Sequence, residues 1–195
     1  MLNTNKFKNY IFDFDGVILD SVEFKNQAFK KTVNRYDKKI VKKFMNFHLN
    51  NLGLSRFRKY KFLCQELLKL ENTDNLEKKL SNNYSKIVNK KILKVKFING
   101  VKNFILKNKE KKLFISSGSP QKELRKICVK KKISKYFIKV LGSPKTKYQH
   151  MIYLKKNYKI KNKETAFFGD SITDYRTAKK YNLTFIQVGN NMKNK

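Results

Sequence analysis

The chain has 195 residues, of which 40% are hydrophobic and 13% aromatic, enough for one domain with a modest insertion and a buried core. No apolar stretch approaches the length of a membrane span, and the N-terminal residues lack the apolar region of a signal sequence, so we expect a cytoplasmic protein with no membrane partner. The net charge of +33 comes mostly from lysines spread along the whole chain, so we do not expect nucleic acid as the main partner, although a positive field attracts anionic substrates.

The first predicted element is a short buried strand over residues 8–13, which leads into two aspartates. Asp13 and Asp15 are spaced i, i+2, a spacing that places both on one face of a strand. Unpaired buried carboxylates are costly, and a bound cation removes that cost. Gly16 lets the backbone turn sharply directly afterwards. The segment therefore predicts a strand end that presents two carboxylates to a metal and a substrate.

A helical block follows the first strand. From Val22 to about Lys94 apolar residues recur at helical spacing, with breaks near 50–53 and 71–74 and no strand signal, so we expect a small helical bundle. His48 here, and His150 later, fall among apolar helical positions and are expected to pack rather than to bind ligands. The cysteines, Cys64 and Cys128, fit no metal spacing and are expected to be reduced thiols.

Strands and helices alternate in the rest of the chain. Strand-like runs occupy 113–115, 137–141, 165–168 and 184–188, and helical patterns occupy 101–109, 120–131, 148–158 and 174–181. This alternation predicts an α/β fold, a doubly wound parallel sheet with its site at the carboxyl ends of the strands. The helical block is then an insertion over residues 18–94, and the core comprises residues 1–17 and 95–195.

Polar groups follow four of the predicted strands. They are Asp13 and Asp15 after the first, Ser116, Ser117 and Gly118 after the second, Lys145 and Lys147 after the third, and Asp170 and Asp174 after the fourth. Adjacent strands lie ~4.8 Å apart, so these ends can converge.

The convergent groups suit phosphoryl transfer. Asp13 and Asp170 offer carboxylates to Mg²⁺, which prefers oxygen ligands. Ser117 and Gly118 can bind a phosphate beside a helix start, and a lysine can neutralise its charge. A carboxylate at Asp15 can protonate the leaving alcohol and later deprotonate water.

In this order and spacing the motifs resemble those of the haloacid dehalogenase superfamily of phosphatases. The run from Asp13 to Val17 is similar to its first motif, Ser117 to its second, a lysine to its third, and Gly169-Asp170 with Asp174 to its fourth. The resemblance covers essentially the whole chain and implies a Rossmann-like core with an inserted all-helical cap. The most similar groups are phosphoglycolate phosphatase-like and β-phosphoglucomutase-like members.

The resemblance also implies roles for the residues. Asp13 would be the nucleophile that forms an aspartyl-phosphate, and Asp15 the general acid and base. Asp13, Asp170 and the backbone carbonyl of Asp15 would hold Mg²⁺, and Asp174 would support the metal or orient the lysine. The implied function is Mg²⁺-dependent hydrolysis of a small phosphorylated metabolite, either a sugar phosphate or a phosphoglycolate-like compound, by a monomer or homodimer.

Several positions stay open at this point. The phosphate-binding serine is Ser116 or Ser117, with Ser117 preferred because it begins the turn before a helix. The motif lysine is Lys145 or Lys147, with Lys147 preferred because it adjoins a helix. Arg56, in a turn that resembles a substrate-reading loop, either binds a carboxylate or second phosphate of the substrate or is a solvent-exposed arginine.

Two other functions compete with the phosphatase. A phosphosugar mutase has the same fold, but such mutases usually carry a histidine at the position of Lys25, which disfavours this hypothesis. A basic nucleic-acid-binding protein with a vestigial site is the third possibility, and it is disfavoured because every catalytic residue type is present.

Overall fold

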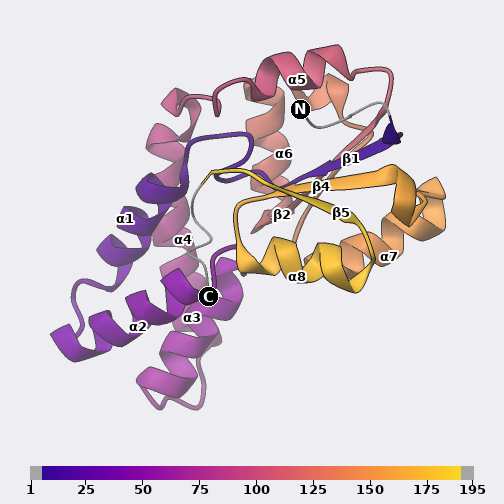
Figure 1. The fold of residues 1–195 in the computed structure, drawn as a ribbon. Helices are drawn as coiled ribbons and strands as arrows, with labels where there is room; N and C mark the ends of the chain where they lie inside the picture. The colour runs from indigo at the N-terminus through magenta and orange to yellow at the C-terminus, as the bar shows by residue number, and fades with distance from the viewer. Residues whose placement is uncertain (1–5, 190–195) are drawn as a thin grey trace.

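The computed structural model describes residues 6–189 and contains a five-stranded parallel sheet (Figure 1). The strand order is β3-β2-β1-β4-β5. The strands are β1 (Asn9–Phe12), β2 (Lys112–Pro120), β3 (Lys139–Ser143), β4 (Thr165–Gly169) and β5 (Thr184–Gln187). The predicted α/β class with a parallel sheet is confirmed, and β1 lies at its centre between β2 and β4.

Helices cover both faces of this sheet. They are α5 (Val101–Lys107), α6 (Gln121–Lys130), α7 (Lys147–Tyr158) and α8 (Ile172–Lys180). Alternate residues of β1 point to opposite faces: Tyr10 and Phe12 belong to the core that includes α5 and α6, and Ile11 belongs to the core that includes α7 and α8. Because both faces of β1 are buried, its four residues are buried without alternation.

A helical cap is inserted between β1 and β2 (Figure 1). Its helices are α1 (Val22–Val33), α2 (Lys38–Asn50), α3 (Arg56–Phe62), which continues into a π-helical segment (Leu63–Leu67), and α4 (Asp74–Lys91), followed by a 3₁₀ turn (Ile92–Lys94). The cap has an aromatic centre in which Phe29 lies near Phe44, Tyr60 and Tyr84.

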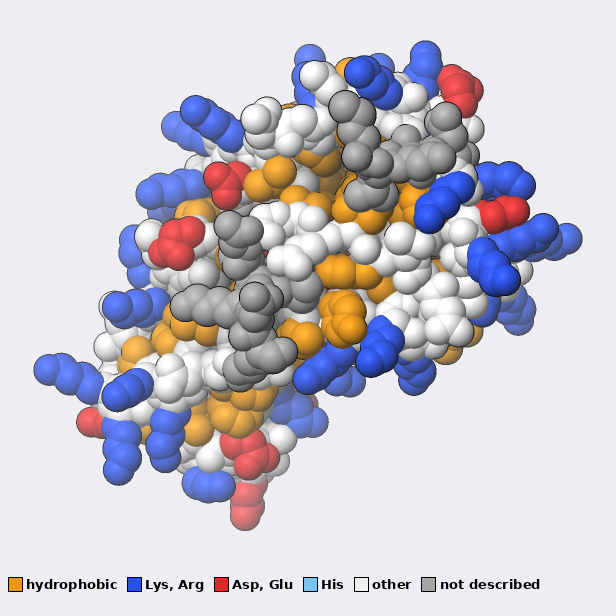
Figure 2. Space-filling view, in the orientation of Figure 1, with side chains coloured by type: hydrophobic (Ala, Val, Ile, Leu, Met, Phe, Trp, Pro, Cys, Tyr) orange, Lys and Arg blue, Asp and Glu red, His pale blue; other side chains and the backbone are white. Residues whose placement is uncertain are grey.

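The distribution of basic side chains and the state of the cysteines are as the sequence predicts. Lysine and arginine side chains are scattered over the visible face rather than gathered over one element (Figure 2). Cys64 and Cys128 are buried and not disulfide-bonded, as predicted. Among the described residues, none of the helices has the length and apolar character that crossing a membrane requires.

Candidate active site

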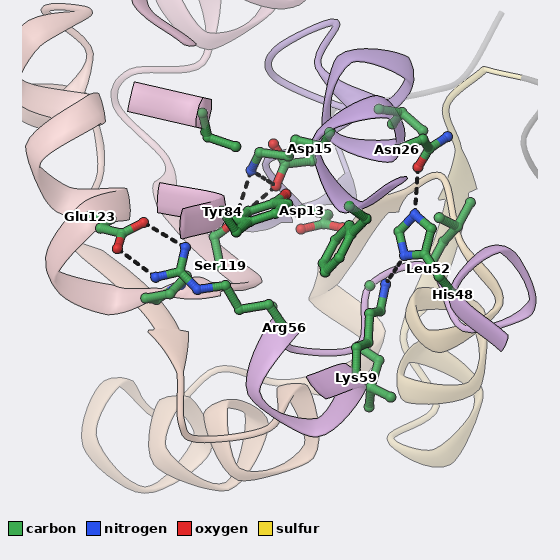
Figure 3. Close-up of a pocket in the computed structure, with 18 of the residues that line it drawn as sticks. Asp13, Asp15, Asn26, His48, Leu52, Arg56, Lys59, Tyr84, Ser119 and Glu123 are labelled. Carbon is green, nitrogen blue, oxygen red and sulfur yellow. Dashed lines mark hydrogen bonds and ion pairs between the residues drawn. The ribbon is translucent and has the colours of Figure 1, made fainter. Parts of the chain in front are cut away.

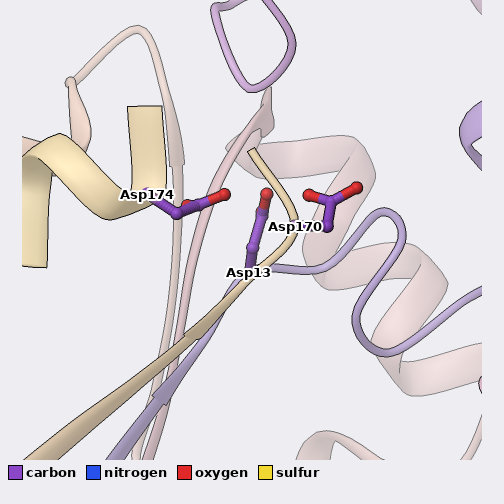
Figure 4. A group of neighbouring side chains, drawn as sticks. All are labelled: Asp13, Asp170 and Asp174. Atoms are coloured by element: carbon purple, nitrogen blue, oxygen red, sulfur yellow. The ribbon is translucent and has the colours of Figure 1, made fainter. Parts of the chain in front are cut away.

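Three buried aspartates meet at the carboxyl end of the sheet (Figure 4). Asp13 directly follows β1, Asp170 directly follows β4, and Asp174 lies in the first turn of α8. Each offers one carboxylate oxygen, and these three oxygens lie within 4.8 Å of one another. The pairing of β1 with β4 explains the meeting, because it brings the two strand ends side by side.

Local structure fixes the orientation of these carboxylates. The backbone N–H of Phe14 donates to Asp13 Oδ1 at 2.6 Å. Ser171 caps α8, and its hydroxyl donates to Asp174 Oδ2 at 2.5 Å. Gly16 has a φ of +78°, and a Cβ at this position would lie 2.1 Å from Asp170 Oδ2, so only glycine lets the chain pass here.

Lys147 joins this group and Lys145 does not. Thr146 caps α7, which makes Lys147 the first residue of the helix and turns its buried side chain inward. Its ammonium Nζ lies 2.8 Å from Asp13 Oδ2 and also contacts Asp174. Burial lowers the pKa of Lys147, but the Asp13 and Asp174 carboxylates outweigh this effect and hold the pKa above its usual value. Lys145 is exposed at the surface.

The charge balance of the group favours a bound cation. Burial, together with the charges of Asp174 and Asp170, raises the pKa of Asp13 to about 8 against the lowering effect of Lys147. Three carboxylates therefore share one ammonium group in a buried place. An all-oxygen donor set of this kind suits a hard divalent cation, so the residues present fit a metal ion.

Asp15 turns away from the other carboxylates. Its side chain accepts hydrogen bonds from Ser21 Oγ at 2.5 Å, Lys25 Nζ at 2.6 Å and Ser119 Oγ at 3.0 Å. Burial raises the pKa of Asp15, but these partners, Lys25 foremost, outweigh it and hold the pKa below its usual value. The Asp15 carboxylate is thus ionised, and it lies apart from the cluster of Asp13, Asp170 and Asp174.

The two candidate serines differ in their surroundings. Ser116 Oγ lies 2.9 Å from His150 Nδ1, on the side of the sheet that α7 covers. Ser117 Oγ instead accepts a hydrogen bond from the backbone N–H of Ser119 at 3.2 Å, in the last part of β2 before α6 begins. The expected turn at these residues is therefore not formed: Ser117 and Gly118 lie in the last part of β2, where its register against β3 shifts. Gly118 lines the cavity described below, and Ser116 points toward α7.

A cavity of about 90 Å³ lies between cap and core (Figure 3). Asp13, Asp15, Asp170 and Gly118 line it from the core, and helices α1, α2, α3 and α4 line it from the cap. The cap loop closes over the sheet end at Gly53, which has a φ of +84°. A Cβ at Gly53 would lie 2.1 Å from Thr173 Oγ1.

Arg56 lines this cavity but has a protein partner. Its guanidinium donates to both carboxylate oxygens of Glu123 on α6, at 2.9 and 2.6 Å, and to Ser81 Oγ at 2.8 Å. Arg56 is 7% exposed, so the alternative of a solvent-exposed arginine is wrong.

Sequence reasoning did not assign several polar side chains to the cavity that they line, among them Lys25, Asn26, His48 and Lys59. Both histidines are buried, as expected of packing residues. Each also makes polar contacts: His48 lies 2.8 Å from Lys59 Nζ and 2.8 Å from Asn26 Oδ1, and His150 hydrogen-bonds with Ser116. Among so many lysines, only the i, i+3 spacing of Lys59 from Arg56 could have placed it on the same helix face as the arginine.

Comparison with known families agrees with this geometry. The family model described as haloacid dehalogenase-like hydrolase matches residues 10–188. The chain belongs to the haloacid dehalogenase-like hydrolases. The match spans both the sheet and the cap of the hydrolase. No curated protein sequence matches it significantly.

Solved structures with the same fold align over nearly the whole hydrolase. A predicted phosphoglycolate phosphatase from Haemophilus somnus 129pt has a TM-score of 0.69 at 19% identity, over 93% of this chain and 84% of that one. A predicted phosphatase from Clostridium acetobutylicum has a TM-score of 0.70 at 19% identity, over 93% and 84%. The β-phosphoglucomutase from Clostridium difficile has a TM-score of 0.73 at 16% identity, over 94% and 85%. At these identities the likeness establishes the fold alone.

Proposed function

We propose that this hydrolase is a Mg²⁺-dependent phosphatase that cleaves a small phosphomonoester through an aspartyl-phosphate. The observation that carries the proposal is the convergence of Asp13, Asp170, Asp174 and Lys147 at one sheet end beside a cavity. Family membership supports a hydrolase, and the named relatives include phosphatases.

Asp13 is the nucleophile in this proposal. One carboxylate oxygen attacks phosphorus, and the bond from phosphorus to the leaving oxygen breaks. Asp15, which is ionised in the free protein, has to bind a proton when the substrate enters and then passes that proton to the departing alcohol. The Phe14 N–H and Lys147 hold the Asp13 carboxylate in one orientation, so little reorganisation is needed for attack. Lys147 also balances negative charge on the phosphoryl oxygens.

Hydrolysis of the aspartyl-phosphate uses the same residues. Asp15 takes a proton from water, the water oxygen attacks phosphorus, and the Asp13 carboxylate leaves. Asp15 is held ionised by Lys25 and Ser119, a state that suits this second half of the reaction. Ser117 and Gly118 bind phosphoryl oxygens at the end of β2, before α6.

Asp13, Asp170 and the backbone carbonyl of Asp15 would hold Mg²⁺, with Asp174 fixing Lys147 beside it. When bound, the ion would screen the carboxylates from the phosphate and stabilise charge on the transferring phosphoryl group. The cap would exclude bulk water from the cavity during the reaction.

A panel of small phosphomonoesters, assayed for phosphate release with Mg²⁺ and with a chelator, tests the proposal. We expect Mg²⁺-dependent turnover that Asp13→Asn abolishes. Glu110→Gln, which removes an exposed carboxylate, is the matched control and should keep the wild-type rate. Turnover that persists in Asp13→Asn, or a wild-type protein that releases no phosphate from any ester, would contradict the proposal.

A further inference from the structure

Three polar side chains of the cap form a row along the cavity wall (Figure 3). Asn26 comes from α1, His48 from α2 and Lys59 from α3. Lys59 Nζ lies 2.8 Å from His48 Nδ1, and His48 Nε2 lies 2.8 Å from Asn26 Oδ1. None of these residues belongs to the machinery proposed above, and nothing in the family motifs of this chain requires them.

The hydrogen bonds of this row fix the state of the histidine. An ammonium group has donors only, so His48 Nδ1 must accept from Lys59. His48 Nε2 then carries the proton and donates to Asn26 Oδ1. Burial, with a further contribution from Lys59, lowers the pKa of His48 to about 3, which agrees with a neutral ring. The row therefore holds Lys59 Nζ in one position on the cavity wall.

Lys59 differs from the other cations of the site in its partners. Each of the others has an acidic partner: Lys25 has Asp15, Arg56 has Glu123, and Lys147 has Asp13 and Asp174. Lys59 is 3% exposed, and within residues 6–189 no carboxylate lies at ion-pair distance from it. Its Nζ also lies over the Phe29 ring, 5.0 Å from the ring centroid, and its one hydrogen bond, to His48, leaves two of its three donors for a ligand.

A buried ammonium group without an anion is unfavourable, and an anionic ligand relieves that cost. The groups that face Lys59 are the neutral His48 on α2, Lys25 on α1 and Asp15 beyond β1. Of these, Lys25 and Asp15 are close enough for their charges to act on it in opposite directions. The nearby charges therefore offset one another instead of pairing with Lys59.

We propose that Lys59, positioned by His48 and Asn26, binds a carboxylate on the leaving group of the substrate. This inference rests on the proposed phosphatase function and deepens it. Lys59 lies on the cap and Asp13 on the core, so a substrate in the cavity would place its phosphate at one and its second anion at the other. A single ammonium group matches a single negative charge, and a cavity of about 90 Å³ favours a leaving group of only a few carbons.

Ligand binding to the non-hydrolysing Asp13→Asn protein with Mg²⁺ tests this inference by calorimetry. The two probes are 2-phosphoglycolate, which carries the carboxylate, and 2-hydroxyethyl phosphate, which replaces it with an alcohol. We expect 2-phosphoglycolate to bind more tightly, and Lys59→Met to weaken it by about 10- to 100-fold while leaving 2-hydroxyethyl phosphate within about twofold. A third probe, ethane-1,2-diol bisphosphate, distinguishes a carboxylate from a second phosphate.

Two further variants control the measurement. Lys61→Met removes an exposed lysine of the same helix and should change neither affinity. Lys59→Gln should repeat the loss seen with Lys59→Met, which covers the case that one variant folds poorly. Three results overturn the inference and leave the phosphatase proposal standing. They are equal binding of 2-phosphoglycolate and 2-hydroxyethyl phosphate, tighter binding of the bisphosphate than of 2-phosphoglycolate, and a ratio of the affinities for the first two probes that changes in neither Lys59 variant. Failure of all three probes to bind also overturns the inference, and the phosphatase proposal is then decided separately by the phosphate-release panel.

Discussion

Arg56 on the cap and Glu123 on the core face each other as a two-pronged ion pair, with nitrogen-to-oxygen distances of 2.9 and 2.6 Å. Ser85 of α4 also donates to Glu123, at 3.0 Å. Burial raises the pKa of Glu123, but the hydrogen bonds and charge of Arg56 outweigh this effect and hold it below its usual value. A carboxylate near the start of α6 thus connects the core to two cap helices.

The pair is expected to stabilise the closed cap. Glu123→Gln and Arg56→Lys each break the two-pronged geometry, and each should raise KM several-fold and lower the free energy of unfolding by about 1–2 kcal/mol. Arg58→Lys, on the exposed side of the same helix, is the matched control. If Arg56 also contacts substrate, the Arg56 variant will lose more activity than the Glu123 variant, and steady-state kinetics of both variants and the double variant decide this point.

Replacement of Gly53 should prevent the cap loop from closing. Gly53→Ala places a methyl group 2.1 Å from Thr173 Oγ1 and adds the strain of a positive φ. Gly100 is the control, because it also has a positive φ but a Cβ added there would meet no atom within 4 Å. We expect about 1 kcal/mol lost in both variants and a large fall in kcat/KM only in Gly53→Ala. Equal activity of the two variants would contradict closure at Gly53.

The buried Lys59 predicts a pH dependence of stability. Burial, with a smaller effect of Lys25, lowers its pKa from 10.5 to about 7. Between these values the unfolded chain binds more protons than the folded protein. The free energy of unfolding should therefore rise with pH across this window, by up to about 1.4 kcal/mol per pH unit. Urea unfolding should show that Lys59→Met lacks this rise, and parallel pH dependences of the two proteins would refute the assignment.

The two candidate lysines give a direct comparison. Lys147 is buried against Asp13 and Lys145 is exposed, so Lys147→Met should lower kcat by about 100-fold or more, whereas Lys145→Met should stay within about twofold. Phosphate-release assays at saturating substrate measure both. A larger loss in Lys145→Met would mean that the lysine assignment is reversed.

Metal binding should be visible without any substrate. Because Mg²⁺ would bind the folded carboxylate group and not the unfolded chain, the Tm should increase with MgCl₂ concentration. NaCl at matched ionic strength should not reproduce the increase. Asp170→Asn should remove it, whereas Glu110→Gln, at an exposed carboxylate, should not. An increase that survives in Asp170→Asn would place the ion elsewhere.

Much of the fold was readable from local sequence because its signals are local. The aspartates after β1 and the Gly-Asp after β4 mark strand ends directly, and parallel pairing then brings them together. The start of β3 was predicted too early, at 137 instead of Lys139. Phe137 is buried against Phe12 at a ring distance of 5.9 Å, and an apolar pattern cannot distinguish such packing from strand pairing.

The cap side of the site was less readable because its contacts are tertiary. Lys59 is one of many lysines, and its role follows only from the packing of α1, α2 and α3 around it. The Arg56 pairing could not be predicted either, since Glu123 lies 67 residues away. Core motifs depend on strand ends, which sequence specifies, whereas the cap depends on how helices meet.

Covalent trapping at Asp13 tests the central claim most directly. The protein is mixed with Mg²⁺ and an ester that it hydrolyses, and the reaction is quenched during turnover. Borohydride then reduces an aspartyl-phosphate to homoserine. Peptide mass spectrometry should find homoserine at position 13, dependent on substrate and absent from Asp13→Asn. Rapid turnover with unmodified Asp13, or homoserine at another aspartate, would contradict the proposed nucleophile.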